Sequence, residues 1–428
     1  MTCAVGLGFP LSMGRVTRLG TSWTKPMEYC LEPRMSQPSD SGGSPSQLTF
    51  ESGGYLYSIQ RPLVSHPDYD TLLLSSRQLA KGGPFKLVVL KPVHLEHGRE
   101  ARTRAMEEVR LSRSLRHRNI APVLGSAVHH EVAYVVMDMG HGRFLLSLMD
   151  AAVSVNRKLS HDFAAYVAAE VADALDCAHR AEDEEGRPLH LVHRAVGPMR
   201  IRVGDDGRIQ LTNFGAAYSE LLGRIRTPPD LLRGDPAYIA PEILLGFCKP
   251  EASQTDPLTP KKLDGRADVF SLGLVLLEML LARYPLDPPD TLWLDVERRF
   301  PPEVRGERSS LLPLETLANR VLHFGPDEVQ RAAEELPAPL RRILSKALRP
   351  HPDERYQTAG QLRDELRAFL GRPEQRKPFG AKEAKAEANA LFTQASNLER
   401  LDAYPVVERG ILPLPPDMTL EGSDEFDD

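Results

Sequence analysis

Residues 193–200 read HRAVGPMR, and residues 213–215 read NFG, eighteen positions after the third residue of the first run. Between these runs, Asp205 and Asp206 lie on a predicted loop that joins two short strands. Further motifs surround them in order over residues 54–371, and the chain contains no internal repeat. With 428 residues, the chain is long enough for a two-lobed domain of about 250–300 residues with an extension at each end.

The composition predicts a globular protein without a general attraction to nucleic acid or anionic lipid, because the net charge is −6. The four cysteines show no C-x-x-C spacing, which favours reduced thiols over disulfides or a zinc site. The most apolar run, Val269 to Ala282, is short and contains Glu278, whereas a membrane span needs about 20 residues. We therefore expect a cytoplasmic protein with no membrane span and no nucleic-acid partner.

The two ends of the chain differ from its middle. Residues 1–49 mix Pro, Gly and Ser with few periodic apolar positions and are predicted to be disordered. Met35 is an alternative to Met1 as the start of translation. Residues 372–428 are predicted to form an extension with one amphipathic helix, from Ala384 to Leu401, and an acidic tail. The helix could lie on the domain, dimerise or bind a partner.

Residues 50–371 are predicted to form the folded domain, with a small lobe at 50–138 and a large lobe at 139–371. The apolar patterns of the small lobe predict five strands and one amphipathic helix. The strands are expected at Tyr55–Leu63, at Asp70–Ser76, at Phe85–Lys91 and in two runs that end with Val132–Met139, and the helix at Arg99–Leu115. Four apolar side chains of the helix are expected to face the core: Met106, Val109, Leu111 and Leu115.

Seven motifs occur in the order found in bacterial serine/threonine protein kinases of the eukaryotic (Hanks) type, and the chain resembles this family over residues 54–371. Residues 193–200 resemble the catalytic loop H-R-D-L-K-P-x-N, and residues 213–215 resemble D-F-G. The other motifs are V-A-x-K at Val88–Lys91, the hinge at Met137–Gly140, A-P-E at Ala240–Glu242, the start of the central helix at Asp264–Gly273 and the late arginine motif at His351–Tyr356. The resemblance implies an α+β fold of two lobes, a small one with a five-stranded antiparallel sheet and one helix, and a larger, mainly helical one.

The resemblance also implies which retained residues hold the fold. His193 would support the catalytic loop from the core, and Asp268 would brace the backbone of that loop. Glu242 and Arg355 would form an ion pair. Arg194 would either have a structural role or bind a phosphorylated activation segment. The candidate phosphorylation sites are Tyr218, Ser219 and Thr227.

The residues that would carry the chemistry differ at four positions: Ala195, Gly197, Arg200 and Asn213. In kinases, magnesium ions bridge the phosphates and an aspartate accepts the proton of the substrate hydroxyl. Ala195 cannot accept a proton, and Gly197 replaces the lysine that contacts the phosphate. Arg200 and Asn213 replace two metal ligands, so one net negative charge becomes one net positive charge. We therefore expect no bound metal and no intact catalytic residue.

Weak binding of ATP or ADP is an alternative that the retained residues leave open. The candidate cofactor-binding residues are Lys91, Glu108 and the hinge residues Met137 and Met139, with Met137 as the gatekeeper. The Lys91–Glu108 pair could equally brace the lobe without a ligand. Residues 55–81 contain no glycine where the family has G-x-G-x-x-G, and Asp68 at the predicted tip would repel a triphosphate.

We therefore expect a catalytically inactive protein of the kinase fold, a pseudokinase, that regulates or scaffolds a protein partner such as an active kinase or another signalling protein. Two alternatives stay open: a switch that binds ATP or ADP without turnover, and a weakly active or atypical serine/threonine kinase. The active enzyme would need a new carboxylate for its metal. Asp205, Asp206 and Asp235 are nearest in sequence, and only Asp235 is placed plausibly.

Overall fold

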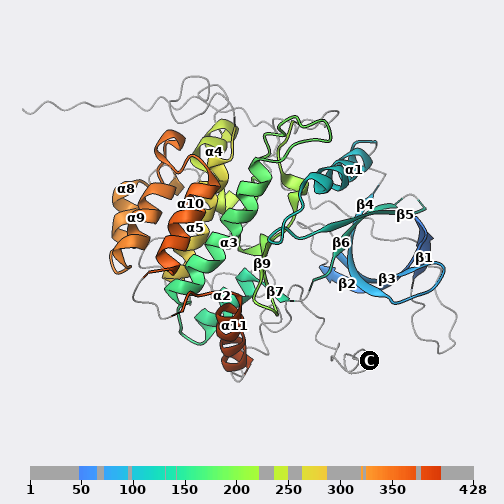
Figure 1. Cartoon of the computed structure of the whole chain (residues 1–428), viewed down its shortest axis with the longest axis horizontal. Helices are drawn as coiled ribbons and strands as arrows, with labels where there is room; N and C mark the ends of the chain where they lie inside the picture. Colours follow the sequence, from blue (N-terminus) through green and yellow to red (C-terminus); the bar gives the residue numbers. More distant parts are fainter. Residues whose placement is uncertain are drawn as a thin grey trace, which may run out of the picture. The chain divides into compact units, whose positions relative to one another are not determined.

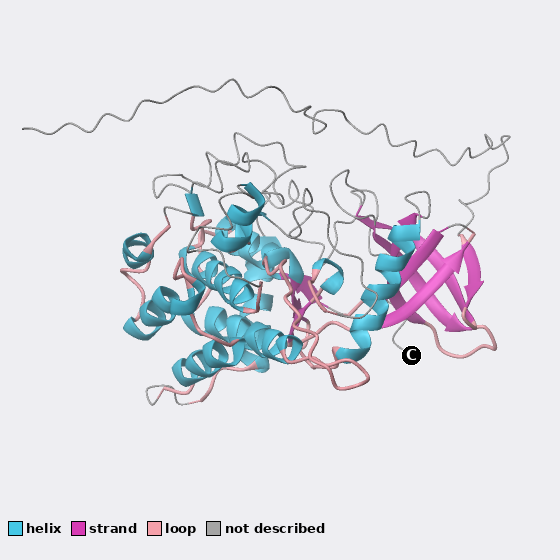
Figure 2. Cartoon of the chain, turned by 90° about the horizontal axis from the view of Figure 1, so that it is seen from above, coloured by secondary structure: helices cyan, strands magenta, loops and turns pink. Residues whose placement is uncertain are grey.

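The protein has a small lobe of strands with one helix and a larger, mainly helical lobe (Figure 1). The expected α+β fold, with a small lobe of strands and a larger helical lobe, is thereby confirmed. Figure 2 shows most of the strands gathered at one end, with a single helix lying along them. The computed structural model describes residues 48–64, 72–94, 99–130, 132–140, 142–220, 236–248, 263–286, 320–321, 324–372 and 377–396.

The small lobe is built on a six-stranded antiparallel sheet. From edge to edge its strands are β1 (Thr49–Ser52), β2 (Tyr55–Val64), β3 (Leu72–Leu79), β4 (Lys86–His94), β6 (Val132–Asp138) and β5 (Val123–His129). Aromatic and β-branched residues, which suit a pleated surface, form the buried cluster on one face of this sheet. Its members are Phe50, Tyr57, Val88, Leu90, Ala127, Tyr134 and Val136.

Strand β1 closes the sheet on itself, so the prediction of five strands was one strand short. The ring of Phe50 in β1 stacks on Tyr134, with centroids 5.5 Å apart, and on His129 of β5, at 4.7 Å. Ser52 Oγ accepts a hydrogen bond from Val128 N at 2.9 Å. The two edge strands of the sheet therefore meet. A strand of four residues has too little alternation to be recognised in a sequence, and only its long-range packing identifies it.

Helix α1 (Arg99–Ser114) packs on β4, β5 and β6. Val109, Leu111 and the following Leu115 are buried as expected, but Met106 is 41% exposed, which corrects the predicted core face. Glu108 is buried instead. Because successive residues of a helix are rotated by roughly 100°, Met106 points about 200° away from Glu108. The helix is oriented by its glutamate as much as by its apolar residues.

The large lobe is organised around two buried helices, α3 (His161–His179) and α5 (Arg266–Leu281). Helix α5 is mostly apolar and is buried from Ala267 to Leu280, as expected for a helix inside a core, with Asp268 and Glu278 among its buried residues. The N-cap residue of α3, Ser160, accepts a hydrogen bond from Phe163 N at 3.1 Å. The other helices of the lobe are α2 (Leu145–Ser154), α4 (Pro241–Cys248), α8 (Pro326–Ala332), α9 (Ala338–Ala347) and α10 (Ala359–Leu370).

A second antiparallel sheet, of β7 (Gly142–Phe144), β8 (Ile201–Gly204) and β9 (Ile209–Leu211), connects the lobes. Ala121 N of the small lobe donates to Leu211 O at 2.9 Å, and Leu211 N donates to Asn119 O at 2.7 Å. These backbone bonds join β9 to the loop that follows α1. Strands β8 and β9 lie between the runs at 193–200 and 213–215 in the sequence.

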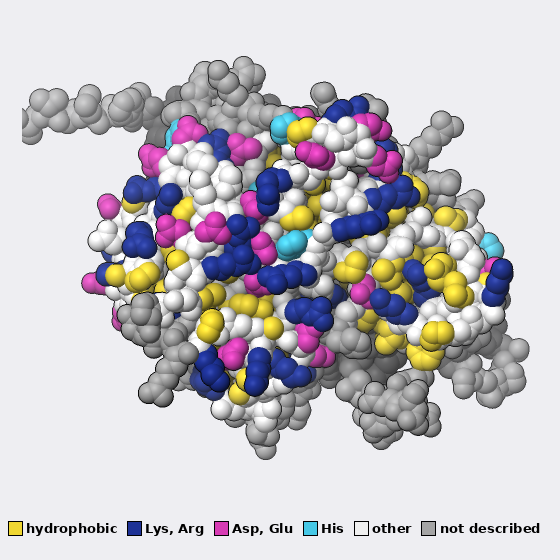
Figure 3. Space-filling view, in the orientation of Figure 1, with side chains coloured by type: hydrophobic (Ala, Val, Ile, Leu, Met, Phe, Trp, Pro, Cys, Tyr) yellow, Lys and Arg dark blue, Asp and Glu magenta, His cyan; other side chains and the backbone are white. Residues whose placement is uncertain are grey.

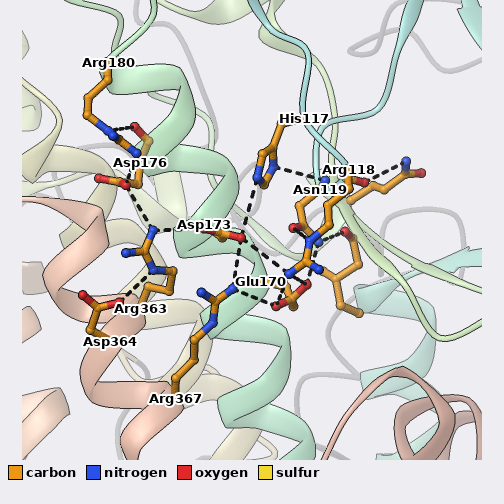
Figure 4. A network of polar contacts seen from close by, with 12 residues as sticks. His117, Arg118, Asn119, Glu170, Asp173, Asp176, Arg180, Arg363, Asp364 and Arg367 are labelled. Atoms are coloured by element: carbon orange, nitrogen blue, oxygen red, sulfur yellow. Dashed lines mark hydrogen bonds and ion pairs between the residues drawn. The ribbon is translucent and has the colours of Figure 1, made fainter.

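A charged network joins the same loop to α3 and α10 (Figure 4). Asn119 Nδ2 donates to Glu170 Oε2 at 2.9 Å. Arg363 and Arg367 of α10 each reach Asp173 of α3 at 3.0 Å. The remaining labelled members are His117, Arg118, Asp176, Arg180 and Asp364. Since a network of charges contributes more reliably than isolated surface pairs, we infer that it helps to hold the two lobes together.

The C-terminal helix α11 (Ala381–Ser396) packs on α2 and α3. Its buried residues are Ala384, Ala388, Leu391 and Ala395. Ser160 donates to Glu387 from its backbone N (2.8 Å) and from Oγ (2.6 Å), and the guanidinium of Arg143 lies 3.8 Å from the ring centre of Phe392. Of the three roles considered for this helix, packing on the domain is the one observed.

The surface differs between the two lobes on the face drawn in Figure 3. Basic and acidic side chains are interspersed over the helical lobe, whereas apolar side chains gather over the strands. Exposed apolar residues on or beside the sheet include Leu56, Leu79 and Phe85. Within the described ranges, no helix combines the length and the apolarity that crossing a bilayer requires.

Candidate active site

The loop at 193–200 is held by Asp268, a fully buried carboxylate in the first turn of α5. Its Oδ2 accepts a hydrogen bond from His193 N at 2.7 Å, and its Oδ1 accepts one from Arg194 N at 2.8 Å. His179 Nε2, at the end of α3, lies 2.8 Å from the same Oδ2. Burial would raise the pKa of Asp268, but the hydrogen bonds and the neighbouring histidines outweigh it, so the pKa is lowered.

His193 links the run at 193–200 to Thr212 and to Phe214 of the run at 213–215. Its side chain is fully buried, and burial lowers its pKa to about 4, so the ring is neutral near pH 7. Nε2 lies 3.0 Å from Thr212 O, and Nδ1 accepts a hydrogen bond from Ala195 N at 3.3 Å. These partners place the proton on Nε2. The ring also packs edge-on against Phe214, with centroids 4.7 Å apart.

A second buried contact joins α4 to the segment before α10. Arg355 donates from Nη1 to Glu242 Oε1 and from Nη2 to Glu242 Oε2, both at 2.8 Å, with side chains 0% and 2% exposed. The carbonyl oxygens of Arg349, Pro350 and Arg266 accept its remaining hydrogen bonds. Both charges are therefore fully paired. We call His193, Arg194, Asp268, Glu242 and Arg355 the frame.

The four replaced positions lie beside this frame. Ala195 presents a buried methyl group, and a Cβ added at Gly197 would lie 3.2 Å from Cδ2 of Tyr238. Arg200 ends the short 3-10 helix Pro198–Arg200 and is partly exposed, and among the described residues its side chain has no hydrogen bond or ion pair. Asn213 has φ 61° and ψ 67°, a left-handed conformation that asparagine tolerates.

These residues do not fit a divalent metal ion. Magnesium prefers carboxylate and phosphate oxygens, whereas Arg200 brings a positive charge and Asn213 a neutral amide. In the part of the chain that the structure describes, no three or more His, Cys, Asp or Glu side chains form a group that could hold a metal. We therefore derive no chemical step through a metal ion.

Lys91 and Glu108, by contrast, form an ion pair. Lys91 Nζ lies 3.7 Å from Glu108 Oε2, with side chains 16% and 5% exposed. Gly215 lies directly against this glutamate, because a Cβ added there would be 2.6 Å from Oε2. Glu108 Oε1 is buried without a hydrogen-bond partner among the described residues. The contact joins β4, α1 and the 213–215 run, and it leaves one buried acceptor unsatisfied.

The hinge follows β6 and contributes Met137 and Met139 to an apolar cluster with Leu74 and Val89. A further residue at this place was not expected from the sequence: Arg202 of β8 donates from Nη1 to the hinge carbonyl of Met139 at 2.6 Å. The sequence does contain a sign that Arg202 has a specific partner, because this charged residue stands between two apolar ones in a strand. Its partner was not recognisable, since it is more than sixty positions away in the sequence.

The remaining candidates are placed as follows. Tyr218 exchanges backbone hydrogen bonds with Val192, and Ser219 is only 5% exposed, so phosphorylation at Ser219 would require local opening. Asp206 pairs with Arg208 on the β8–β9 turn. Thr227, Asp235 and the predicted tip at residues 64–68, apart from Val64 at the end of β2, lie outside the described residues.

The comparisons with known proteins point to one family. The model of the protein kinase domain matches residues 79–365, more than half of the chain. Tyrosine-protein kinase MasK of Myxococcus xanthus is 26% identical over 292 residues, which cover 63% of this chain and 42% of MasK. Serine/threonine-protein kinase PksC of Streptomyces coelicolor is 26% identical over 283 residues, 63% of this chain and 45% of PksC. The chain thus spans less than half the length of these relatives.

Among solved structures, the kinase domain of PknI from Mycobacterium tuberculosis is similar to this chain. The two share 21% sequence identity with a TM-score of 0.46, and the match covers 74% of this chain and 96% of that chain.

Proposed function

Because this chain belongs to the protein kinase domain family, we propose that it is a pseudokinase that regulates or scaffolds a protein partner in signalling, such as an active kinase, in the cytoplasm. The observation that carries the proposal is the contrast between a fully bonded frame and the four replaced positions. The general base alone contributes roughly 10²–10⁴-fold in such reactions, and Ala195 cannot supply it. The retained contacts support a role that needs the fold without phosphoryl transfer.

Phosphoryl transfer is tested with radiolabelled ATP, magnesium or manganese, and a general protein substrate. The wild-type chain is compared with Lys91→Met, which removes the lysine that pairs with Glu108. We expect equal, background incorporation of label in both proteins. Metal-dependent transfer by the wild type that disappears in Lys91→Met would disprove the inactive pseudokinase and support the weakly active kinase instead.

The regulatory role has its own test. The chain is added to an active protein kinase from the same organism, and the rate of autophosphorylation of that kinase is measured. We expect the rate to change with the concentration of the chain and to saturate. The heat-denatured chain is the control and should leave the rate unchanged.

A second function, a switch that binds ATP or ADP without turnover, is favoured by one observation. The Lys91–Glu108 pair is formed, and Glu108 Oε1 is left without a hydrogen bond among the described residues. The ammonium of Lys91 has three N–H donors, so it can bind a phosphate oxygen of ATP or ADP beside Glu108. Addition of ATP without metal should then raise the melting temperature of the wild type, and less so that of Lys91→Met.

A further inference from the structure

The side chain of Arg202 contacts the backbone of the hinge. Its position in β8 decides this direction: Ile201 and Val203 on either side are buried in the core of the large lobe, so the side chain between them points to the opposite face. Nη1 donates to Met139 O at 2.6 Å and approaches Asp138 O at 3.5 Å. The guanidinium therefore contacts two consecutive carbonyl groups of the hinge backbone.

The guanidinium is also fixed from other sides. Nη2 donates to the side-chain oxygen of Gln210, its cross-strand neighbour in β9. Gly140 of the hinge lies so close that an added Cβ would be 2.2 Å from Cζ of Arg202. Gly140 has φ 58°, a conformation in which glycine is favoured. The guanidinium can therefore approach the hinge because Gly140 adopts this positive φ and has no side chain.

Only 5% of the surface of Arg202 is exposed, which is unusual because arginine side chains mostly lie at the protein surface. Burial lowers its pKa from the usual value, while the carboxylates of Asp138 and Asp206 oppose that change. A buried charge is tolerated when hydrogen bonds satisfy it, and here they come from backbone and amide oxygens. The contacts therefore hold the side chain in place under the hinge.

We propose that Arg202 is an internal plug: its guanidinium occupies the carbonyl groups of the hinge backbone and so prevents the base of a nucleotide from binding there. A purine base that binds a backbone hinge needs a free carbonyl acceptor for its amino group. It also needs an apolar surface above and below its ring, as flat ligands generally do. Leu74, Val89 and Met137 supply such a surface on the side of the small lobe. On the opposite side, a guanidinium covers the carbonyls instead.

This proposal concerns binding of the base and does not depend on whether the chain transfers phosphate. It also treats the hinge separately from the basic residues that would face the phosphates. Lys91 and Arg200 could still attract a phosphate group while the hinge stays closed. A nucleotide would then bind weakly and through its phosphates, until Arg202 moves away from the carbonyls.

Binding of adenosine tests the plug, because adenosine carries the base without any phosphate. The full chain is titrated with adenosine by calorimetry, as wild type, as Arg202→Leu and as Arg202→Met. We expect no measurable binding to the wild type at millimolar adenosine and at least a tenfold gain in affinity in both variants. Methionine keeps most of the length of the side chain, so it serves if leucine lowers the stability too far.

The matched control is Arg208→Leu, which removes a neighbouring arginine that is 68% exposed and pairs with Asp206. It should bind adenosine as poorly as the wild type. Tight binding of adenosine to the wild type would overturn the proposal without any variant. Equal affinity in the wild type, Arg202→Leu and Arg208→Leu would overturn it as well. Failure of the phosphoryl-transfer prediction would leave this result unchanged.

Discussion

The frame and the four replaced positions are two sets of residues in the large lobe that differ in how they are bonded. The frame is fully bonded: Asp268 accepts hydrogen bonds from two consecutive amides, and the charges of Glu242 and Arg355 are paired at 2.8 Å. The four replaced positions offer a methyl group, a missing side chain, a guanidinium and an amide instead. In the described part of the chain, the guanidinium of Arg200 has no partner.

The difference shows that the groups that hold the fold and the groups that would do chemistry are separable in this domain. The frame points into the large lobe, where losing one hydrogen bond leaves a buried polar group unsatisfied. The replaced positions carry no comparable penalty, because none of them is needed to satisfy a buried charge. A chain can therefore keep the first set and change the second without unfolding.

The largest effect is expected for Arg355→Leu. It leaves the carboxylate of Glu242 buried and unpaired, and breaking such a pair costs about 3–5 kcal/mol. Urea denaturation should show this loss in the free energy of unfolding. The control is Arg349→Leu, an arginine that is 39% exposed and lies 3.8 Å from Glu354, which should cost about 0–1 kcal/mol. Similar losses in both variants would remove the distinction between frame and surface.

The second effect is a dependence of stability on pH that comes from His193. Its pKa is about 4 in the folded protein and 6.5 in the reference state, so the unfolded chain binds the proton more readily. The free energy of unfolding should therefore fall as the pH drops from 6.5 to 4, by up to about 3 kcal/mol. The lowered pKa of Asp268 acts below this window, because its reference value is 3.8.

His193→Gln isolates this contribution from those of other histidines. Glutamine can still donate a hydrogen bond to Thr212 O, but it has no proton to gain between pH 6.5 and 4. Urea denaturation at several pH values should show a shallower decline for the variant than for the wild type. Parallel declines would mean that His193 does not carry the pH dependence.

The smallest effects are expected at the replaced positions. Arg200→Asn removes a side chain without a partner among the described residues, and Asn213→Asp keeps a residue type that tolerates φ 61°. Each should change the free energy of unfolding by less than about 1 kcal/mol. A loss as large as that of Arg355→Leu would show that these positions belong to the frame after all.

Much of the fold could be predicted from the sequence, because its motifs are local. The runs at 193–200 and 213–215 and the pattern of strands and helices indicated two lobes before any contact was known. Two details could not be predicted. Met106 is exposed because Glu108 faces Lys91, and a count of apolar residues cannot anticipate an ion pair. Strand β1 depends on Phe50, whose partners lie on β2, β5 and β6.

The family, the order of the motifs and the chemical identity of the replaced residues can be recognised from the sequence alone, since each depends on a few neighbouring positions. Three contacts became known from the folded structure: Arg202 with the hinge, Asn119 with Glu170, and α11 with the large lobe. These contacts join residues separated by fifty or more positions. Packing and the need to satisfy buried charges determine such contacts, and both depend on the whole folded chain.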